Sequence, residues 1–374
     1  MKFYQYPHID NYHKFTSQIL SNSDLPDMLS FSGTIKLHGT NGAVRQNADG
    51  LIYTQSRNRI ITDTDDNLGF SQFVTSRLCE FERIFRYIRA NNNNDNNSTI
   101  VLFGEFCGKG VQSNVGIGSF EKFFVIFDIF IDDQTKRTSV WANMKDMVDG
   151  VFSCKDNDKR IFNIAQFDTF HICIPTNDMA SVGPLLDEMS ENIGNSCPVA
   201  KFLRGKEECE ENKSKCNSAC NQGEGIVWKC DNYQSHENLE NPFWFKSKCK
   251  LFSKRPPPRQ QNAMNKAEIS VVANEFADTF VTPMRVSQGV AYLKEFNHPI
   301  SIQSMGIFLT WIVDDVMRED GYDIDPKISI VYKKAISAKA RPIFTHLVAS
   351  SSDMCPDPEH LKPGLCQLQQ ETVL

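Results

Sequence analysis

Hydrophobic and polar residues alternate in short runs between residues 31 and 250, and Gly, Asn and Asp separate these runs. Alternation with a period of two is typical of β-strands, in which successive side chains point to opposite faces of a sheet. The clearest predicted strands are Thr99–Gly104, Phe123–Phe130, Gly225–Lys229 and Phe243–Lys248. This part of the chain is therefore predicted to be mixed in structure but rich in strands.

The character of the chain changes after residue 250. The segment 251–261 contains three consecutive prolines between Arg255 and Arg259, a composition that favours an extended, semi-rigid backbone. The predicted organisation is a first domain, this linker, a second domain and a loose tail, at residues 1–250, 251–261, 262–350 and 351–374.

The second domain shows the periodicity of helices. Thr282 and Pro283 fit the N-cap and the first position of a helix. Apolar residues then recur at spacings of three and four between Ile307 and Val316, and Gly321 follows as a stop signal. These features predict a small helical bundle.

Two polar stretches interrupt the first domain. The stretch Asn91–Asn97 is asparagine with one aspartate, which cannot bury enough apolar surface to offset the entropy of ordering it. It is predicted to be a disordered loop insertion. Glu207–Gln222, with its lysines, glutamates and cysteines, is predicted to be an exposed loop.

Composition limits the ways in which the protein could bind nucleic acid. A chain of 374 residues with 40% hydrophobic content can bury a substantial core, but its net charge of -6 argues against coating nucleic acid with the whole surface. The segment Lys246–Lys266 is an exception, because it has seven Lys or Arg and no Asp or Glu. It is a local footprint for a polyphosphate or a nucleic-acid backbone.

The sequence contains twelve cysteines, whose redox state depends on the cellular compartment of the protein. The sequence starts without a basic and apolar leader, so reduced thiols in the cytosol or nucleus are expected. No apolar run approaches the roughly 20 residues of a membrane span, which predicts a soluble protein. A group formed by Cys209, Cys216, Cys220 and Cys230 raises the question of zinc, but it has no Cys-x-x-Cys pair, which argues against that metal.

The candidate chemistry begins at Lys36. This lysine follows the alternating run Phe31–Ile35, so it is expected at the end of a strand, where Gly39 lets the backbone approach a ligand. A lysine becomes a nucleophile when burial or nearby cations destabilise its ammonium form. Residues two apart in a strand share a face, so Lys246, Lys248 and Lys250 are expected to supply such cations and to bind an anion.

Six short segments of the first domain carry candidate functional residues, and their order along the chain is informative. They are Lys36–Asn41, Gln55–Arg59, Phe103–Gly108, Phe124–Ile129, Glu224–Lys229 and Phe245–Lys248. Together they resemble the ordered nucleotidyltransferase motifs of the lysyl-AMP ligase superfamily. The form KLHGTN, with histidine where DNA ligases and capping enzymes usually carry aspartate, resembles the RNA ligase 2 family, which includes the RNA-editing ligases. The resemblance covers roughly residues 1–250.

The resemblance implies an α+β fold, with a nucleotidyltransferase (ATP-grasp-like ligase) domain of antiparallel sheets and helices. A small, mainly helical C-terminal domain would follow and help to engage RNA ends. The implied substrate is RNA with a 5′-phosphate and a 3′-hydroxyl, expected as a nicked duplex, and the protein is expected to be a monomer. ATP and Mg²⁺ or Mn²⁺ would be required.

The resemblance also assigns roles to residues. Lys36 would form a covalent phosphoramidate with AMP, and Glu224 would help to hold the divalent metal. Glu105 would bond the ribose, and Phe124 would stack on adenine, with Phe123 as the alternative. The implied nucleotide pocket comprises Ile35, His38, Thr40, Asn41, Arg57, Glu105, Phe124, Lys246 and Lys248.

The implied reaction has three steps, in which AMP passes from ATP to the lysine, then to a 5′-phosphate, and is released when a 3′-hydroxyl seals the strand. Such a ligase would serve RNA repair or RNA editing. A DNA ligase or capping guanylyltransferase is an alternative, but those families carry a β-rich domain after the last motif. A catalytically silent RNA-binding protein of the same fold is another. Thr282–Arg285 is a possible RNA-contacting helix start.

Overall fold

The computed structural model describes residues 2–19, 25–91, 97–112, 115–133, 138–142, 144, 160–205, 221–233, 243–252, 266–321 and 324–352. The chain divides into two compact units, Met1–Arg255 and Pro256–Leu374. This division falls inside the predicted linker, most of which lies outside the described residues. The functions assigned to the two domains remain predictions.

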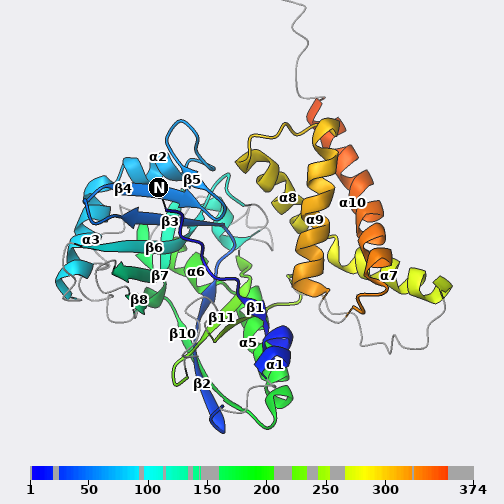
Figure 1. Cartoon of the computed structure of the whole chain (residues 1–374), viewed down its shortest axis with the longest axis horizontal. Helices are drawn as coiled ribbons and strands as arrows, with labels where there is room; N and C mark the ends of the chain where they lie inside the picture. Colours follow the sequence, from blue (N-terminus) through cyan, green and yellow to red (C-terminus); the bar gives the residue numbers. More distant parts are fainter. Residues whose placement is uncertain are drawn as a thin grey trace, which may run out of the picture. The chain divides into compact units, whose positions relative to one another are not determined.

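Two sheets form the framework of the first unit (Figure 1). Sheet A has the strand order β1 (Asp10–Asn11), β12 (Trp244–Lys248), β11 (Gly225–Cys230), β2 (Met28–Lys36) and β10 (Thr169–Pro175). Its pairs are antiparallel except for β1 with β12. The strands predicted near residues 225 and 245 are confirmed. They pair with each other in this sheet.

Sheet B is also mostly antiparallel. Its order is β5 (Ile60–Ile61), β4 (Ile52–Ser56), β3 (Thr40–Gln46), β6 (Ser98–Cys107), β7 (Phe123–Asp133) and β8 (Thr138–Ala142), and β9 (Ile161–Asn163) pairs in parallel with β7. The two central strands, β6 and β7, confirm the strands predicted near residues 100 and 125, and both are longer than predicted. The predicted α+β class with antiparallel sheets is confirmed.

Helices cover one face of each sheet. The helices α2 (Phe70–Thr75) and α3 (Leu78–Asn91) pack on sheet B, because α3 places apolar side chains at spacings of three and four toward the strands. Sheet A packs against α1 (Tyr12–Ile19) and α5 (Gly183–Asn195), and α6 (Pro198–Arg204) joins the same core.

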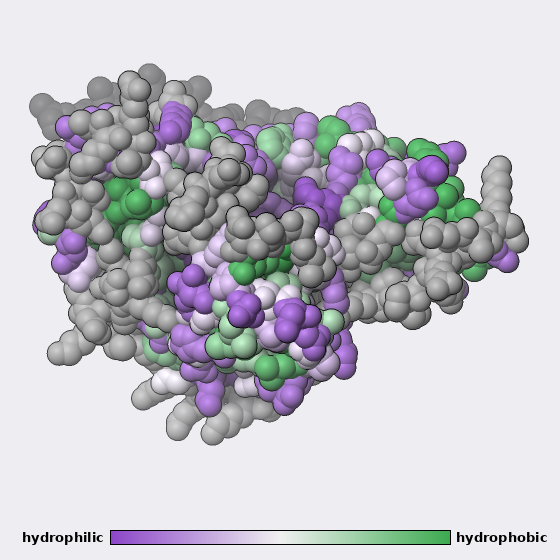
Figure 2. Space-filling view, turned by 60° about the horizontal axis from the view of Figure 1, so that its bottom comes forward, coloured by the Kyte–Doolittle hydropathy of each residue, from purple (hydrophilic) through white to green (hydrophobic). Residues whose placement is uncertain are grey.

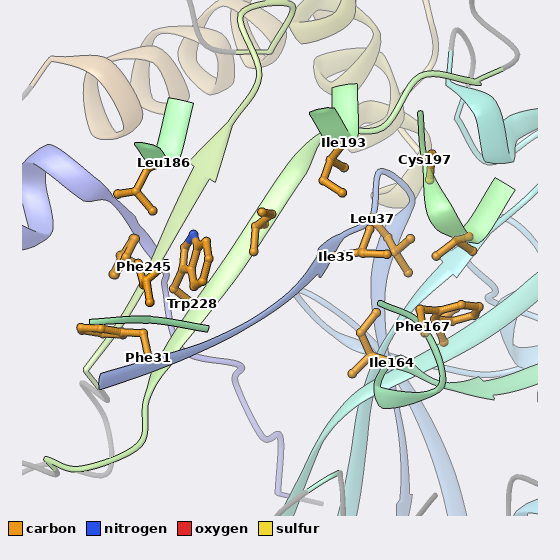
Figure 3. Packing of buried hydrophobic residues seen from close by; sticks show 14 of the residues in the cluster. Phe31, Ile35, Leu37, Ile164, Phe167, Leu186, Ile193, Cys197, Trp228 and Phe245 are labelled. Carbon is orange, nitrogen blue, oxygen red and sulfur yellow. The ribbon is translucent and has the colours of Figure 1, made fainter. Parts of the chain in front are cut away.

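The aromatic core of sheet A explains which way Lys36 points. Phe31, Trp228 and Phe245 are fully buried and pack together on one face of the sheet (Figure 3). Gly33 permits this packing, because a Cβ there would lie 2.6 Å from the Trp228 ring. Since side chains alternate along β2, the polar residues of that strand point to the other face.

The second unit is helical, as predicted. It contains α7 (Lys266–Phe280), α8 (Pro283–Glu295), α9 (Met305–Asp320) and α10 (Ser329–Ser352). Thr282 caps α8 by accepting a hydrogen bond from the backbone N–H of Arg285, and α9 ends at the predicted stop. The helix α10 continues two residues into the predicted tail, and the rest of that tail lies outside the described residues.

Two predicted loops lie largely outside the described part of the chain. The centre of the asparagine-rich insertion, 92–96, and the segment 206–220 lie outside the described residues. Asn91 is the last residue of α3.

Figure 2 shows one face of the protein, on which the hydrophilic residues of the described part of the chain are interspersed with smaller hydrophobic patches. Exposed large hydrophobic side chains such as Met28, Leu185 and Val271 come from separate elements. Among the residues that the structure describes, no helix is both long and apolar enough to cross a membrane.

Candidate active site

Lys36 lies at the end of β2, and the strand register places it in a row with Gly225 and Lys248. Directly paired residues share a face of a sheet, so both lysines point away from the aromatic core. Gly225 between them is required sterically, because a Cβ there would lie 2.1 Å from the carbonyl oxygen of Ser247. The row therefore presents two lysines with no side chain between them.

The carboxylate of Glu224 joins this row. Its Oε2 lies 2.7 Å from Lys36 Nζ and 3.2 Å from His38 Nδ1, and its Oε1 lies 3.2 Å from Lys248 Nζ. The Glu224 side chain is only 3% exposed. Burial alone would raise the pKa of this carboxyl, but the charges of Lys36 and Lys248 outweigh burial and hold the pKa well below its ordinary value.

This geometry adds a constraint on Lys36 that the sequence does not show. The sequence predicts neighbouring cations, which would favour the neutral amine. The structure also places the Glu224 carboxylate in direct contact with Lys36. Lys36 is therefore flanked by a cation and held in an ion pair with a carboxylate.

A second carboxyl, Glu105, approaches from sheet B. It accepts a hydrogen bond of 2.9 Å from the backbone N–H of Gly39. Burial raises the pKa of Glu105 to about 7, even though Lys36 and the Gly39 N–H favour the ionised form. Gly39 is needed for this approach, because a Cβ there would lie 2.3 Å from the carbonyl oxygen of Phe106.

Other predicted pocket residues surround this pair of carboxyls. Asn41 pairs with Glu105 across β3 and β6, and Thr40 precedes it on the same strand. Arg57 is exposed in the turn between β4 and β5, and its charge favours the ionised form of Glu105. His38 is buried, and its Nε2 has no hydrogen-bond partner within the described part of the chain.

Three predicted residues are placed differently. Phe124 pairs with Phe106 while Val125 pairs with Glu105, so Phe124 points to the opposite face of sheet B. There its ring centroid lies 4.9 Å from that of Phe70. The structure does not bring Phe124 to Lys36, and the stacking role remains a prediction.

Phe123 and Ile35 are core residues. Phe123 is fully buried beside Phe162, with ring centroids 6.0 Å apart. The Ile35 side chain is 3% exposed and lies in the core with Leu37 (Figure 3), so only its backbone can contact a ligand.

The lysine series on β12 is shorter than predicted. Lys246 and Lys248 lie on the strand, and Lys246 pairs with Val227, two rows away from Lys36. The expectation that Lys250 shares their face is wrong, because β12 ends at Lys248 and the chain turns. The backbone N–H of Cys249 donates to the carbonyl oxygen of Glu224 in this turn. Two lysines, rather than three, line the strand.

A further polar group, which the sequence did not reveal, includes Lys229 on the same face of sheet A as Lys36. Tyr6 donates a hydrogen bond of 2.5 Å to Asp128, which also binds Lys229. The Lys229 ammonium lies 4.7 Å from the ring centroid of Trp244. Burial, then Asp128, raises the pKa of Tyr6 well above its ordinary value. Asp128 and Lys229 lie within the recognised motifs, but only the fold brings Tyr6 to them.

The site fits a cation that needs few protein ligands. Within the described residues, no group of three or more His, Cys, Asp or Glu could hold a metal ion. Three of the four cysteines considered for zinc lie outside those residues. Mg²⁺ commonly binds one or two carboxylates and takes its other ligands from phosphate and water, so Glu224 alone would be a sufficient protein ligand.

Comparisons with known proteins give one family. A family model described as RNA ligase matches residues 30–248. Solved structures of Naegleria gruberi RNA ligase are similar to the chain, including a mutant with ATP and Mn at 17% identity and a TM-score of 0.41. A structure of the same protein with PPi has 17% identity and a TM-score of 0.40.

These structural similarities are partial. The match with the ATP and Mn structure covers 67% of this chain and 58% of that chain, and the match with the PPi structure covers 67% and 57%. The chain thus spans less than two thirds of those proteins. No curated protein matches the chain.

Proposed function

The chain belongs to the RNA ligase family, and on this premise we propose that it joins RNA ends with ATP, using Lys36 as the nucleophile that takes up AMP. The observation that carries the proposal is the row formed by Lys36, Gly225 and Lys248, with Glu224 in contact with both lysines. In this row a partly buried candidate nucleophile and a second lysine both contact one buried carboxylate, which supports the proposal that Glu224 holds a metal beside them. We therefore propose a reaction of the phosphoryl-transfer type.

In the first step, the neutral amine of Lys36 attacks the α-phosphate of ATP. A nitrogen–phosphorus bond forms, the bond to the β-phosphate oxygen breaks, pyrophosphate leaves, and the amine loses a proton. Lys246 and Lys248 stabilise the negative charge that develops on the phosphate oxygens, because preorganised cations act strongly where water is excluded. In-line geometry and charge stabilisation account for most catalysis of this kind.

Glu224 links Lys36 to the metal in this proposal. Its carboxylate forms an ion pair with Lys36. A divalent cation held by Glu224 with phosphate oxygens and water would neutralise that carboxylate and supply positive charge to the phosphate. Mg²⁺ or Mn²⁺ would serve.

Residues from sheet B orient the nucleotide. Glu105, which is partly protonated near neutral pH, can donate or accept a hydrogen bond with a ribose hydroxyl. Thr40 and Asn41 lie beside it, and the exposed guanidinium of Arg57 can bind a phosphate or the donor end.

The second and third steps complete the joining of RNA. The 5′-phosphate of one RNA end attacks the phosphorus of the lysyl-AMP and releases Lys36. The 3′-hydroxyl of the other end then attacks the activated 5′-phosphate, forms the phosphodiester and releases AMP. A nicked duplex is the expected substrate, and the protein is expected to act as a monomer.

Covalent labelling tests the first step. Incubation with α-labelled ATP and Mg²⁺ should give a protein–AMP adduct that is labile in acid and stable in alkali. Both Lys36→Ala and Lys36→Arg should abolish it. Lys36→Arg is the sharper variant, because it retains a cation next to Glu224 and removes only the nucleophilic amine. Lys109→Ala, at an exposed lysine of the same unit, should label normally.

Absence of labelling in the folded wild-type protein, or persistent labelling of Lys36→Arg, would exclude Lys36 as the nucleophile. Pre-adenylated nicked RNA, nicked DNA and single-stranded RNA would then identify the substrate, and efficient sealing of DNA alone would exclude the RNA ligase activity.

A further inference from the structure

The charges of the second unit are segregated between helices. The helix α10 contains the cations Lys333, Lys334, Lys339 and Arg341, and it has no Asp or Glu. Its neighbour α9 is acidic, with four carboxylates and one arginine among its 16 residues. In a chain with a net charge of -6, this makes α10 a local basic element.

The cations of α10 lie on its exposed side. Lys334 and Arg341 are both exposed and are seven residues apart. At 3.6 residues per turn they fall on one face, separated by about 10.5 Å along the axis. Exposed Lys327, seven residues before Lys334, precedes the helix, and exposed Lys333 flanks this face. The small exposed residue Ala338 lies between Lys334 and Arg341, so a ligand backbone can approach closely.

Within the described residues, Lys339 is the one cation of α10 that forms an ion pair. Lys339 pairs with Asp278 of α7. For Lys333, Lys334 and Arg341, the described part of the chain supplies no side-chain ion pair or hydrogen bond. Like charges along one helix repel each other, and a bound polyanion would remove that repulsion.

The other basic candidate of this unit is already engaged. Arg285, in the helix start considered as an RNA contact, lies 2.7 Å from Asp320 and 3.2 Å from Asp315. Its side chain is 13% exposed. Its charge therefore holds α8 to α9, and α10 is the better candidate for binding an external anion.

We propose that the exposed face of α10, defined by Lys333, Lys334 and Arg341, binds the sugar–phosphate backbone of the RNA that this protein joins. The choice of RNA rests on the proposed function, whereas the preference for a polyanion rests on the charges of the helix. Contacts of this kind fix the position of the nucleic acid and give affinity without reading its sequence.

The test uses the full chain and a fluorescent nicked RNA duplex, without ATP or metal so that no turnover occurs. The variant Lys334→Ala/Arg341→Ala is compared with Lys201→Ala/Lys294→Ala, which removes two exposed cations elsewhere. Binding anisotropy is measured over a range of salt concentrations. The α10 variant should bind roughly tenfold or more weakly at moderate salt, and the slope of log K against log salt should become shallower by about 2.

Each outcome decides the proposal. A loss confined to the α10 variant, with an unchanged thermal unfolding curve, supports it. Binding equal to wild type, or a loss matched by the control variant, overturns it. Labelling with α-labelled ATP is measured on the same proteins and should be unaffected by either variant. If the wild type is not labelled, the proposed ligase function fails while the binding comparison still tests the α10 surface.

Discussion

Replacing Glu105 by Gln should change how stability depends on pH. The pKa of Glu105 is about 7 in the folded protein, against an ordinary value of 4.5, and burial is the main cause. Each pKa unit corresponds to about 1.4 kcal/mol, so ionised Glu105 lowers the free energy of unfolding by about 3 kcal/mol relative to the neutral acid. Gln has the shape of the neutral acid and can still accept the hydrogen bond from Gly39.

The direction follows from where the proton is bound. Below about pH 4.5 the carboxyl is neutral in both the folded and the unfolded chain. Between about pH 4.5 and pH 7 the folded protein retains a proton that the unfolded chain has released, so its stability falls as pH rises. Above about pH 7 the deficit is constant. Glu105→Gln lacks this loss entirely.

The assay is urea unfolding followed by tryptophan fluorescence. Trp141, Trp228 and Trp244 lie in the first unit, so a Trp311→Phe background makes the signal specific for that unit. From about pH 5 to about pH 8, the free energy of unfolding of Glu105→Gln should rise relative to the unsubstituted Glu105 protein by about 2–3 kcal/mol.

A matched control separates this effect from general charge removal. Glu121→Gln replaces an exposed carboxylate of the same unit, and its pH dependence should follow that of the parent. Parallel pH curves for Glu105→Gln and its parent would refute the inference that burial of Glu105 disfavours its charged form.

Three further substitutions test other parts of the structure. The low pKa of Glu224 stabilises the folded protein above about pH 4.5, and this contribution is lost as pH falls further. Glu224→Gln should remove the contribution, so its free energy of unfolding in urea should fall below that of the wild type at neutral pH and approach it at acidic pH. Gly225→Ala should destabilise the first unit by on the order of 1–3 kcal/mol, because its Cβ collides with Ser247, and an unchanged urea midpoint would contradict the close approach. Arg285→Ala removes the buried arginine that Asp315 and Asp320 share and should cost about 3 kcal/mol in thermal unfolding. Arg318→Ala, at a half-exposed arginine that also contacts Asp315, should cost less than about 1 kcal/mol.

The sequence by itself determined the features that depend on local pattern. Alternating residues predicted the strands that became β6, β7, β11 and β12, and helical spacing predicted the bundle of the second unit. The position of Lys36 at the end of a strand and the cap at Thr282 were equally local. Such features depend on backbone geometry within a few neighbouring residues, and that geometry is encoded directly in the order of residue types.

Tertiary structure alone decided which side chains meet. A shift of one residue in strand register moves a side chain to the other face of a sheet. The pairing of β6 with β7 therefore decided that Glu105 and Phe124 lie on opposite faces of sheet B. The contact of Glu224 with Lys36 joins residues nearly two hundred positions apart. No periodicity within either segment specifies such a contact, because it arises only when separate strands align in a sheet.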